Sequence, residues 1–136
     1  PVAALDDALS RIGDRWTLLV VDALLDGPRR FGDLSDQVTG IAPNVLSKRL
    51  RRLEADGLVH STPYHHRPVR LAYELTEPGR RLAGALSLLA TWGAGLSQRP
   101  DGRRHGACGT PLEARLWCPT CDRPVDDPEA DADIRL

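Results

Sequence analysis

The sequence contains no methionine, and Lys48 is the only lysine among its 18 basic residues. Aromatic residues make up only 4% of the chain, and no apolar run approaches the length of a membrane span. The start of the chain at Pro1 lacks the pattern of a signal peptide. The missing methionine predicts that a short N-terminal stretch has been lost or left out, and the arginine bias is typical of a GC-rich genome. Because neither a membrane span nor a signal peptide is indicated, a cytoplasmic location without a membrane partner is expected.

The remaining composition is ordinary for a soluble globular protein, with 41% hydrophobic and 27% charged residues in a chain of 136. This length predicts one domain with appendages. The net charge of −1 conceals a basic segment over residues 29–81, at +4, and an acidic segment over residues 122–136, at −4. A basic middle favours a polyanionic partner. A solvated surface with a solubilising tail is the alternative, and charge alone does not separate the two.

Residues 43–56 are predicted to form a helix with two unlike faces. Helical spacing gives a core-facing stripe made of Leu46, Leu50 and Leu53. The opposite face carries groups that reach base edges and phosphates in a major groove, namely Asn44, Ser47, Lys48 and Arg51. Arg49 lies between these faces, where a salt bridge and a DNA contact are equally plausible. Pro43 suits the first turn and Gly57 the left-handed position after the last. Taken alone, the run also fits an ordinary amphipathic surface helix.

The flanking segments favour a DNA-binding interpretation of this helix. Helices are expected over residues 2–12, 15–25 and 32–38, with a short extended piece over 29–31. A short helix and a tight turn therefore precede residues 43–56, as in a helix-turn-helix.

Two strands are predicted after this helix, over residues 58–64 and 69–75, joined by a loop over 65–68. They form a β-hairpin whose basic tip, with Arg67 and Arg70, can lie along DNA as a wing; a plain surface hairpin is the alternative. Weaker phosphate contacts are predicted for Arg29, Arg30 and Arg52, and His65 and His66 contribute only weakly near neutral pH.

The last helix is expected over residues 76–97, with Thr76 as its N-cap. Its apolar stripe suits packing on the first helix, on a second subunit, or on both. The predicted fold class is mainly α with a small β-hairpin. Residues 1–98 form the domain, residues 99–104 are a linker, and the acidic residues 126–136 are expected to be disordered.

All three cysteines lie in a C-terminal segment with the spacing of a zinc site. The pattern is His105-x2-Cys108-x9-Cys118-x2-Cys121, in which two short-spaced pairs can close on one tetrahedral ion. About 21 residues over 105–125 cannot bury a core of their own, so a structural Zn²⁺ would order them as a ribbon. The alternatives are free thiols, or a redox pair between Cys118 and Cys121. His105 is the weakest ligand of the four.

Four blocks of the sequence resemble HxlR-type winged helix-turn-helix transcriptional regulators, over residues 12–19, 25–34, 41–59 and 73–82. The resemblance implies a cytoplasmic bacterial regulator that binds operator DNA as a homodimer formed by the terminal helices. Many members carry a Cys-Pro pair before the first helix, and in some that cysteine senses oxidants or electrophiles. The corresponding cysteine would precede Pro1.

The expected function is sequence-specific binding to a pseudo-palindromic operator, with release by an unknown redox or small-molecule effector. A protein-interaction adaptor that uses the ribbon as its main recognition surface is the alternative. An enzyme is not expected, because the sequence shows no nucleophile–base pair, phosphate loop or paired carboxylates at suitable spacing.

Overall fold

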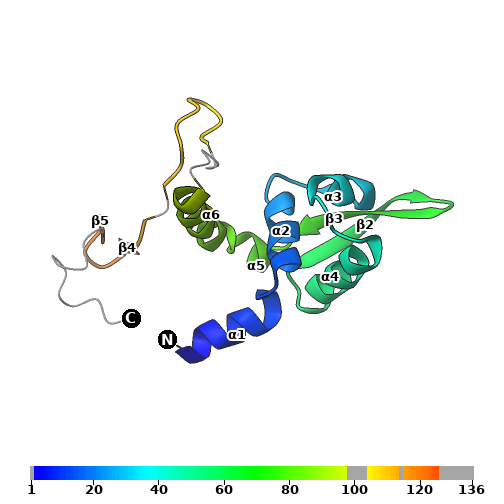
Figure 1. The fold of residues 1–136 in the computed structure, drawn as a ribbon, viewed down its shortest axis with the longest axis horizontal. Helices are drawn as coiled ribbons and strands as arrows, with labels where there is room; N and C mark the ends of the chain where they lie inside the picture. Colours follow the sequence, from blue (N-terminus) through cyan, green and yellow to red (C-terminus); the bar gives the residue numbers. More distant parts are fainter. Residues whose placement is uncertain (1, 98–103, 114, 126–136) are drawn as a thin grey trace. The chain divides into compact units, whose positions relative to one another are not determined.

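The computed structural model describes residues 2–97, 104–113 and 115–125. Val2–Leu86 form one unit, and the described residues from Ser87 onward belong to a second. The predicted linker, apart from Arg104, and the predicted acidic tail lie outside the described residues. The elements, shown in Figure 1, are α1 (Val2–Ile12), α2 (Arg15–Leu24), β1 (Arg29–Arg30), α3 (Phe31–Gln37), α4 (Pro43–Ala55), β2 (Val59–His66), β3 (Val69–Leu75), α5 (Glu77–Arg80), α6 (Ala83–Ser97), β4 (Trp117–Cys118) and β5 (Arg123–Pro124).

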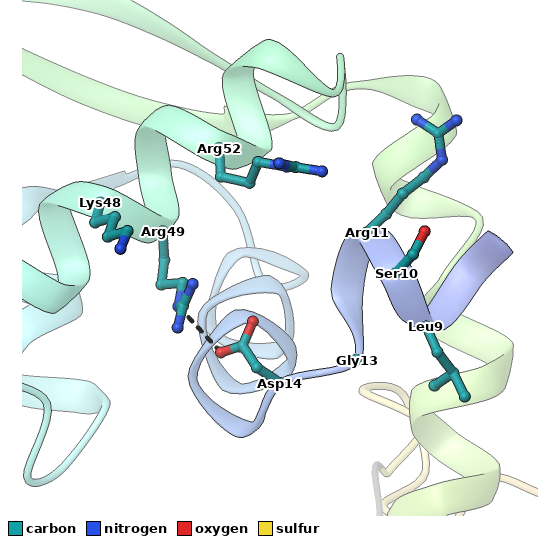
Figure 2. Close-up of a pocket in the computed structure, with 8 residues that line it drawn as sticks. All are labelled: Leu9, Ser10, Arg11, Gly13, Asp14, Lys48, Arg49 and Arg52. Atoms are coloured by element: carbon teal, nitrogen blue, oxygen red, sulfur yellow. Dashed lines mark ion pairs between the residues drawn. The ribbon is translucent and has the colours of Figure 1, made fainter. Parts of the chain in front are cut away.

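Hydrogen bonds at Gly13 and Asp14 fix the turn between α1 and α2. The Gly13 amide donates to the Leu9 carbonyl at 2.7 Å, and a Cβ at position 13 would collide with that same oxygen. Asp14 is the N-cap of α2 and accepts from the Thr17 amide at 3.0 Å. Its carboxylate also pairs with Arg49 of α4 (Figure 2). The sequence predicted only a helix break here, so the capping role is new.

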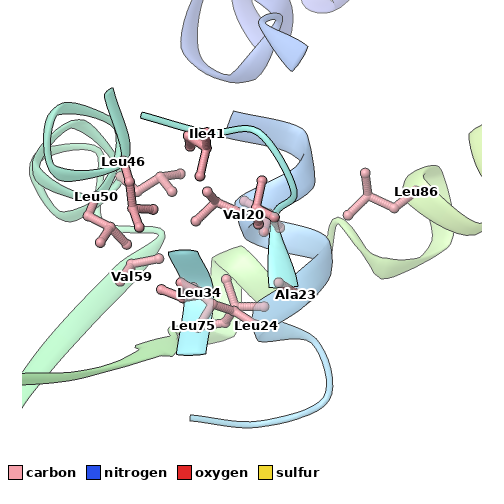
Figure 3. Packing of buried hydrophobic residues seen from close by; sticks show 13 residues of the cluster. Val20, Ala23, Leu24, Leu34, Ile41, Leu46, Leu50, Val59, Leu75 and Leu86 are labelled. Atoms are coloured by element: carbon pink, nitrogen blue, oxygen red, sulfur yellow. The ribbon is translucent and has the colours of Figure 1, made fainter. Parts of the chain in front are cut away.

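The core lies between α2, α3, α4 and the small sheet (Figure 3). The predicted stripe of α4 is confirmed, because Leu46, Leu50 and Leu53 are each no more than 1% exposed. Facing residues from the other elements include Val20, Leu24, Leu34, Val59 and Leu75. Full burial of each such side chain contributes about 1.5–3 kcal/mol, so this stripe fixes which face of α4 remains free.

Three strands form an antiparallel sheet in the order β1-β3-β2. The hairpin is confirmed, but the predicted loop over residues 65–68 is wrong. His65 pairs with Arg70 and His66 with Val69, so β2 continues to the tip and only Arg67 and Pro68 remain in the turn. The register shifts between Pro63 and His65, which is consistent with a proline that cannot donate to the ladder.

The single helix predicted over residues 76–97 is wrong, because α5 and α6 are separate. Thr76 is the expected N-cap, and its hydroxyl accepts from the Gly79 amide at 3.3 Å. The Leu82 amide then bonds the Gly79 carbonyl three residues back, at 3.2 Å, which ends α5. No helix among the described residues is long and apolar enough to cross a membrane.

Both terminal helices leave apolar side chains in solvent within one chain. In α6, Leu86 is buried in the core, whereas the next members of the stripe, Leu89, Trp92 and Leu96, are 53%, 68% and 69% exposed. In α1, Val2, Leu5 and Leu9 are 82%, 60% and 51% exposed, and the helix has no buried residue. Burial in the core therefore explains only the first part of the predicted apolar stripe in α6. It explains none of the apolar residues of α1.

Candidate nucleic-acid interface

The ends of α4 are built as the sequence predicted. Pro43 occupies the first turn. At the other end, Gly57 has a φ of +69°, its amide bonds the Glu54 carbonyl, and the Leu58 amide bonds the Leu53 carbonyl at 2.9 Å. These two bonds satisfy carbonyls that the helix would otherwise leave unpaired. The helix is thus held at its end as well as along its buried stripe.

The face of α4 opposite the core carries the four residues predicted to meet base edges. Asn44, Lys48 and Arg51 are exposed, and Ser47 is half-buried. The guanidinium of Arg51 lies along the helix, with its Nη2 at 3.4 Å from Ser47 Oγ and its Nε at 3.4 Å from the Ser47 carbonyl. Bonds of this length are weak, so the side chain is available to a partner in the groove.

The helix pattern left open whether Arg49 forms a salt bridge or contacts DNA, and the structure shows a salt bridge. Its Nε lies 3.1 Å from Asp14 Oδ1, and this nitrogen is buried without a partner in hydrogen-bond geometry. The contact is therefore an ion pair rather than a hydrogen bond. Partial burial raises the pKa of Asp14, but hydrogen bonds from Thr17 and the charge of Arg49 outweigh it, and the net pKa is lowered. Arg49 thus belongs to the scaffold behind the exposed face.

The weaker phosphate candidates have intramolecular partners. Arg29 donates from Nε to Gln37 Oε1 at 3.3 Å, and Arg52 pairs with Asp56 at 2.9 Å. The guanidinium of Arg30 stacks over the ring of Tyr64, 4.5 Å from its centroid.

The two wing arginines are less constrained. Arg67 lies in the hairpin turn and Arg70 in β3, and both are exposed. Neither side chain has a hydrogen bond or ion pair to another described residue. None of the observed contacts tests the role of these residues on DNA, and their assignment stays a prediction.

A shallow cleft of about 300 Å³ lies beside α4, between it and the end of α1 (Figure 2). Its lining residues are Leu9, Ser10, Arg11, Gly13, Asp14, Lys48, Arg49 and Arg52. Arg11 was not among the predicted site residues, because it is far from α4 along the chain. The only sequence signal was a basic residue in the last turn of the first helix.

The cysteine segment forms two separate local structures. In the first, the Gly109 amide bonds the His105 carbonyl at 2.7 Å, and Gly109 has the left-handed φ of +70° that suits a tight knuckle. In the second, β4 and β5 pair around Cys118 and Cys121. His105 Nδ1 lies 3.2 Å from Cys108 Sγ, so each predicted half-site brings its own residues together.

Two of the thiols have lowered pKa values for local reasons. Hydrogen bonding with Thr110, and then with His105, lowers the pKa of Cys108. Hydrogen bonds from Cys121, and then from the Thr120 backbone, lower the pKa of Cys118. Thiolates are the form that binds metals, so the donor chemistry fits zinc. However, the described residues contain no group of three or more His, Cys, Asp or Glu side chains placed to hold one ion.

The short helix α3, the turn before α4, the free polar face of α4 and the β2–β3 hairpin define a winged helix-turn-helix protein. A sequence model described as HxlR-like helix-turn-helix matches residues 11–101. The chain belongs to this family.

Similar proteins and solved structures are described as regulators, in agreement with this family. An HTH-type transcriptional regulator of Mycobacterium tuberculosis is 41% identical over 122 residues, which cover 87% of this chain and 77% of that protein. The solved structure of the HTH-type regulator YtcD is 35% identical and covers 70% of this chain and 97% of that one, with a TM-score of 0.64. The redox regulator HypR in its oxidised form is 34% identical, with coverages of 68% and 95% and a TM-score of 0.63. These relatives are regulators rather than enzymes.

Proposed function

We propose that the protein is a cytoplasmic transcriptional regulator that binds specific DNA through α4. The observation that carries the proposal is the division of α4 into a fully buried leucine stripe and an opposite face bearing Asn44, Ser47, Lys48 and Arg51. Asn bonds adenine bidentately, and Arg or Lys reads guanine. The wing would contact the flanking backbone or minor groove through Arg67 and Arg70, with Arg29, Arg30 and Arg52 as further phosphate contacts.

The DNA-binding form is proposed to be a homodimer made through the terminal helices. The exposed apolar side chains of α1 and α6 support this proposal, because exposed groups of such residues mark protein interaction sites. Two copies of α4 would then enter successive major grooves about one helical turn apart, and the operator would be pseudo-palindromic.

Selection from random double-stranded DNA with the purified protein tests this function directly. The expected product is a motif of two inverted half-sites about 10 bp apart between their centres. Titration of the selected DNA and a scrambled duplex, followed by fluorescence anisotropy, should show much tighter binding to the selected one. Equal affinities for the two would contradict sequence-specific regulation.

A redox or small-molecule signal is proposed to control DNA binding. Structural relatives include the redox regulator HypR and the Bacillus subtilis regulator YodB, the latter solved in reduced and quinone-bound forms. The adaptor function is not favoured, because the exposed face of α4 suits DNA better than it suits a protein surface.

The C-terminal segment is proposed to bind one structural Zn²⁺ through His105, Cys108, Cys118 and Cys121. Two knuckle-like halves and thiols of lowered pKa support the proposal. The ion would join the halves into a single ribbon, a step that local hydrogen bonds do not supply.

A further inference from the structure

The cleft between α1 and α4 concentrates positive charge on the flank of the proposed recognition helix. Four cations line it, namely Arg11, Lys48, Arg49 and Arg52. Two carboxylates offset them, since Asp14 pairs with Arg49 and Asp56 pairs with Arg52. A net charge of +2 remains at a site of about 300 Å³, a size suited to a small ligand.

The unpaired charges in the cleft belong to Arg11 and Lys48. Both side chains are exposed, and neither has a hydrogen bond or ion pair to another described residue. Figure 2 shows Arg49 turned toward Asp14, while Arg11 and Lys48 stand on opposite elements at the edges of the cleft. Cationic donors therefore approach the cleft from both α1 and α4.

Contacts at the turn between α1 and α2 hold Arg11 at the edge of the cleft. Arg11 lies in the last turn of α1, which the bond from the Gly13 amide to the Leu9 carbonyl closes. Asp14 follows at once and is tied both to the first turn of α2 and to Arg49. The end of α1 is thus connected to α4 through one capping residue, and Arg11 stands across the cleft from Lys48.

We propose that this cleft binds a phosphate group, with Arg11 and Lys48 as its principal charged donors and Arg52 as a third. A phosphate offers several acceptor oxygens in different directions and is negatively charged both as a diester and as a free ion, which suits cationic donors on two elements. Two sources share this chemistry: the phosphate of DNA that flanks the groove, and a free phosphate ion or ester.

The test uses the full-length protein, the Arg11→Gln variant and a matched control, Arg81→Gln. Arg81 is also exposed and helix-adjacent but lies outside the cleft. Glutamine keeps the helix propensity of arginine while it removes the charge. Circular dichroism of each variant checks that the fold is intact.

The first arm adds inorganic phosphate at constant ionic strength and follows the amide signal of Gly13 and the Nε–H signals of the arginines by NMR. Saturable shifts in the wild type that become several-fold weaker in Arg11→Gln, and not in Arg81→Gln, identify a free phosphate as occupant. This arm needs no DNA, so it stands apart from the proposed regulatory function.

The second arm measures the salt dependence of binding to the selected DNA and to the scrambled duplex. A decrease of about one in the slope of log K against log salt for Arg11→Gln, on both duplexes, identifies a DNA phosphate as occupant. Unchanged values in both arms would overturn the proposal. Failure of the wild type to bind DNA would refute the regulator and leave the first arm decisive for the cleft.

Discussion

The Asp14 carboxylate caps α2 and lies 3.1 Å from Nε of Arg49 in α4. Because Asp14 also comes directly after the turn that ends α1, this one residue joins three elements. One side chain thereby satisfies the first turn of α2 and neutralises a partly buried cation next to the proposed DNA-contacting face. The cap and the ion pair can be separated by substitution, since asparagine caps a helix as well as aspartate but carries no charge.

Substitution of Asp14 should destabilise the fold in two steps. Asp14→Asn keeps the cap and loses the pair, whose partners are 38% and 30% exposed for Asp14 and Arg49, so the expected cost is only about 0.2–1 kcal/mol. Asp14→Ala also loses the cap, which adds about 1 kcal/mol. Urea unfolding of the three proteins measures both steps, and equal stabilities of the Asn and Ala variants would contradict the capping role.

The charge on Asp14 should also make the stability depend on pH. Because its folded-state pKa lies below the ordinary value of 3.8, the stabilisation is fully present above about pH 4 and is lost as the pH falls through the folded-state pKa. The advantage of the wild type over Asp14→Asn should therefore shrink in that acidic range. A gap in the free energy of unfolding that stayed constant down to pH 2 would assign the effect to something other than the charge.

Arg51 and Arg67 should affect DNA binding differently. Arg51→Ala should cost about 1–3 kcal/mol on the selected operator and little on scrambled DNA if the side chain reads a base. Arg67→Ala should weaken both duplexes alike and flatten the salt dependence, as expected of a phosphate contact. Anisotropy titrations at several salt concentrations separate the two patterns, and equal losses on both duplexes for Arg51→Ala would remove it from the base-reading set.

Replacement of Gly57 should destabilise the fold, although an added side chain would meet no other atoms. A Cβ there meets nothing within 4 Å, but the φ is +69°, so Gly57→Ala should cost about 1 kcal/mol through backbone strain alone. Gly32 offers a matched control, because its Cβ also meets nothing and it lies within α3 without a positive φ. Gly32→Ala should stabilise by about 0.4–1 kcal/mol. Thermal unfolding that moved both variants in the same direction would contradict this account.

The exposed apolar side chains of the terminal helices should determine the oligomeric state. Leu5→Gln and Trp92→Gln remove side chains that are 60% and 68% exposed in one chain, so the core should be unaffected. Light scattering coupled to gel filtration should show a dimer for the wild type and a larger monomer fraction for each variant. A monomeric wild type at micromolar concentration would contradict the proposed dimer.

Zinc content tests the proposed ribbon. Purified protein that has not been exposed to chelators should contain about one Zn²⁺ per chain, as a Cys3His set binds one ion. Cys118→Ser should lower this value, and Thr120→Ser, a neighbour outside the predicted ligand set, should not. A zinc content near zero in the unstripped wild type would exclude the site.

The sequence by itself determined the position and orientation of α4. Its leucines repeat with the helical period and its polar residues fill the opposite side, and these local periodicities follow directly from residue order. Gly57 and the β2–β3 hairpin were predictable for the same reason, because turn chemistry is local.

The tertiary structure decided what local patterns leave open. Arg49 is equally suited to either side of its helix, and only the approach of Asp14 from the start of α2 makes it a structural ion pair. Likewise, one apolar period runs through residues 82–96, yet Leu86 is buried in the core and Trp92 is 68% exposed. Arg11 and Lys48 line one cleft because the Gly13 turn sets the direction of α1. Such contacts depend on distances between segments far apart in sequence, which no local periodicity contains.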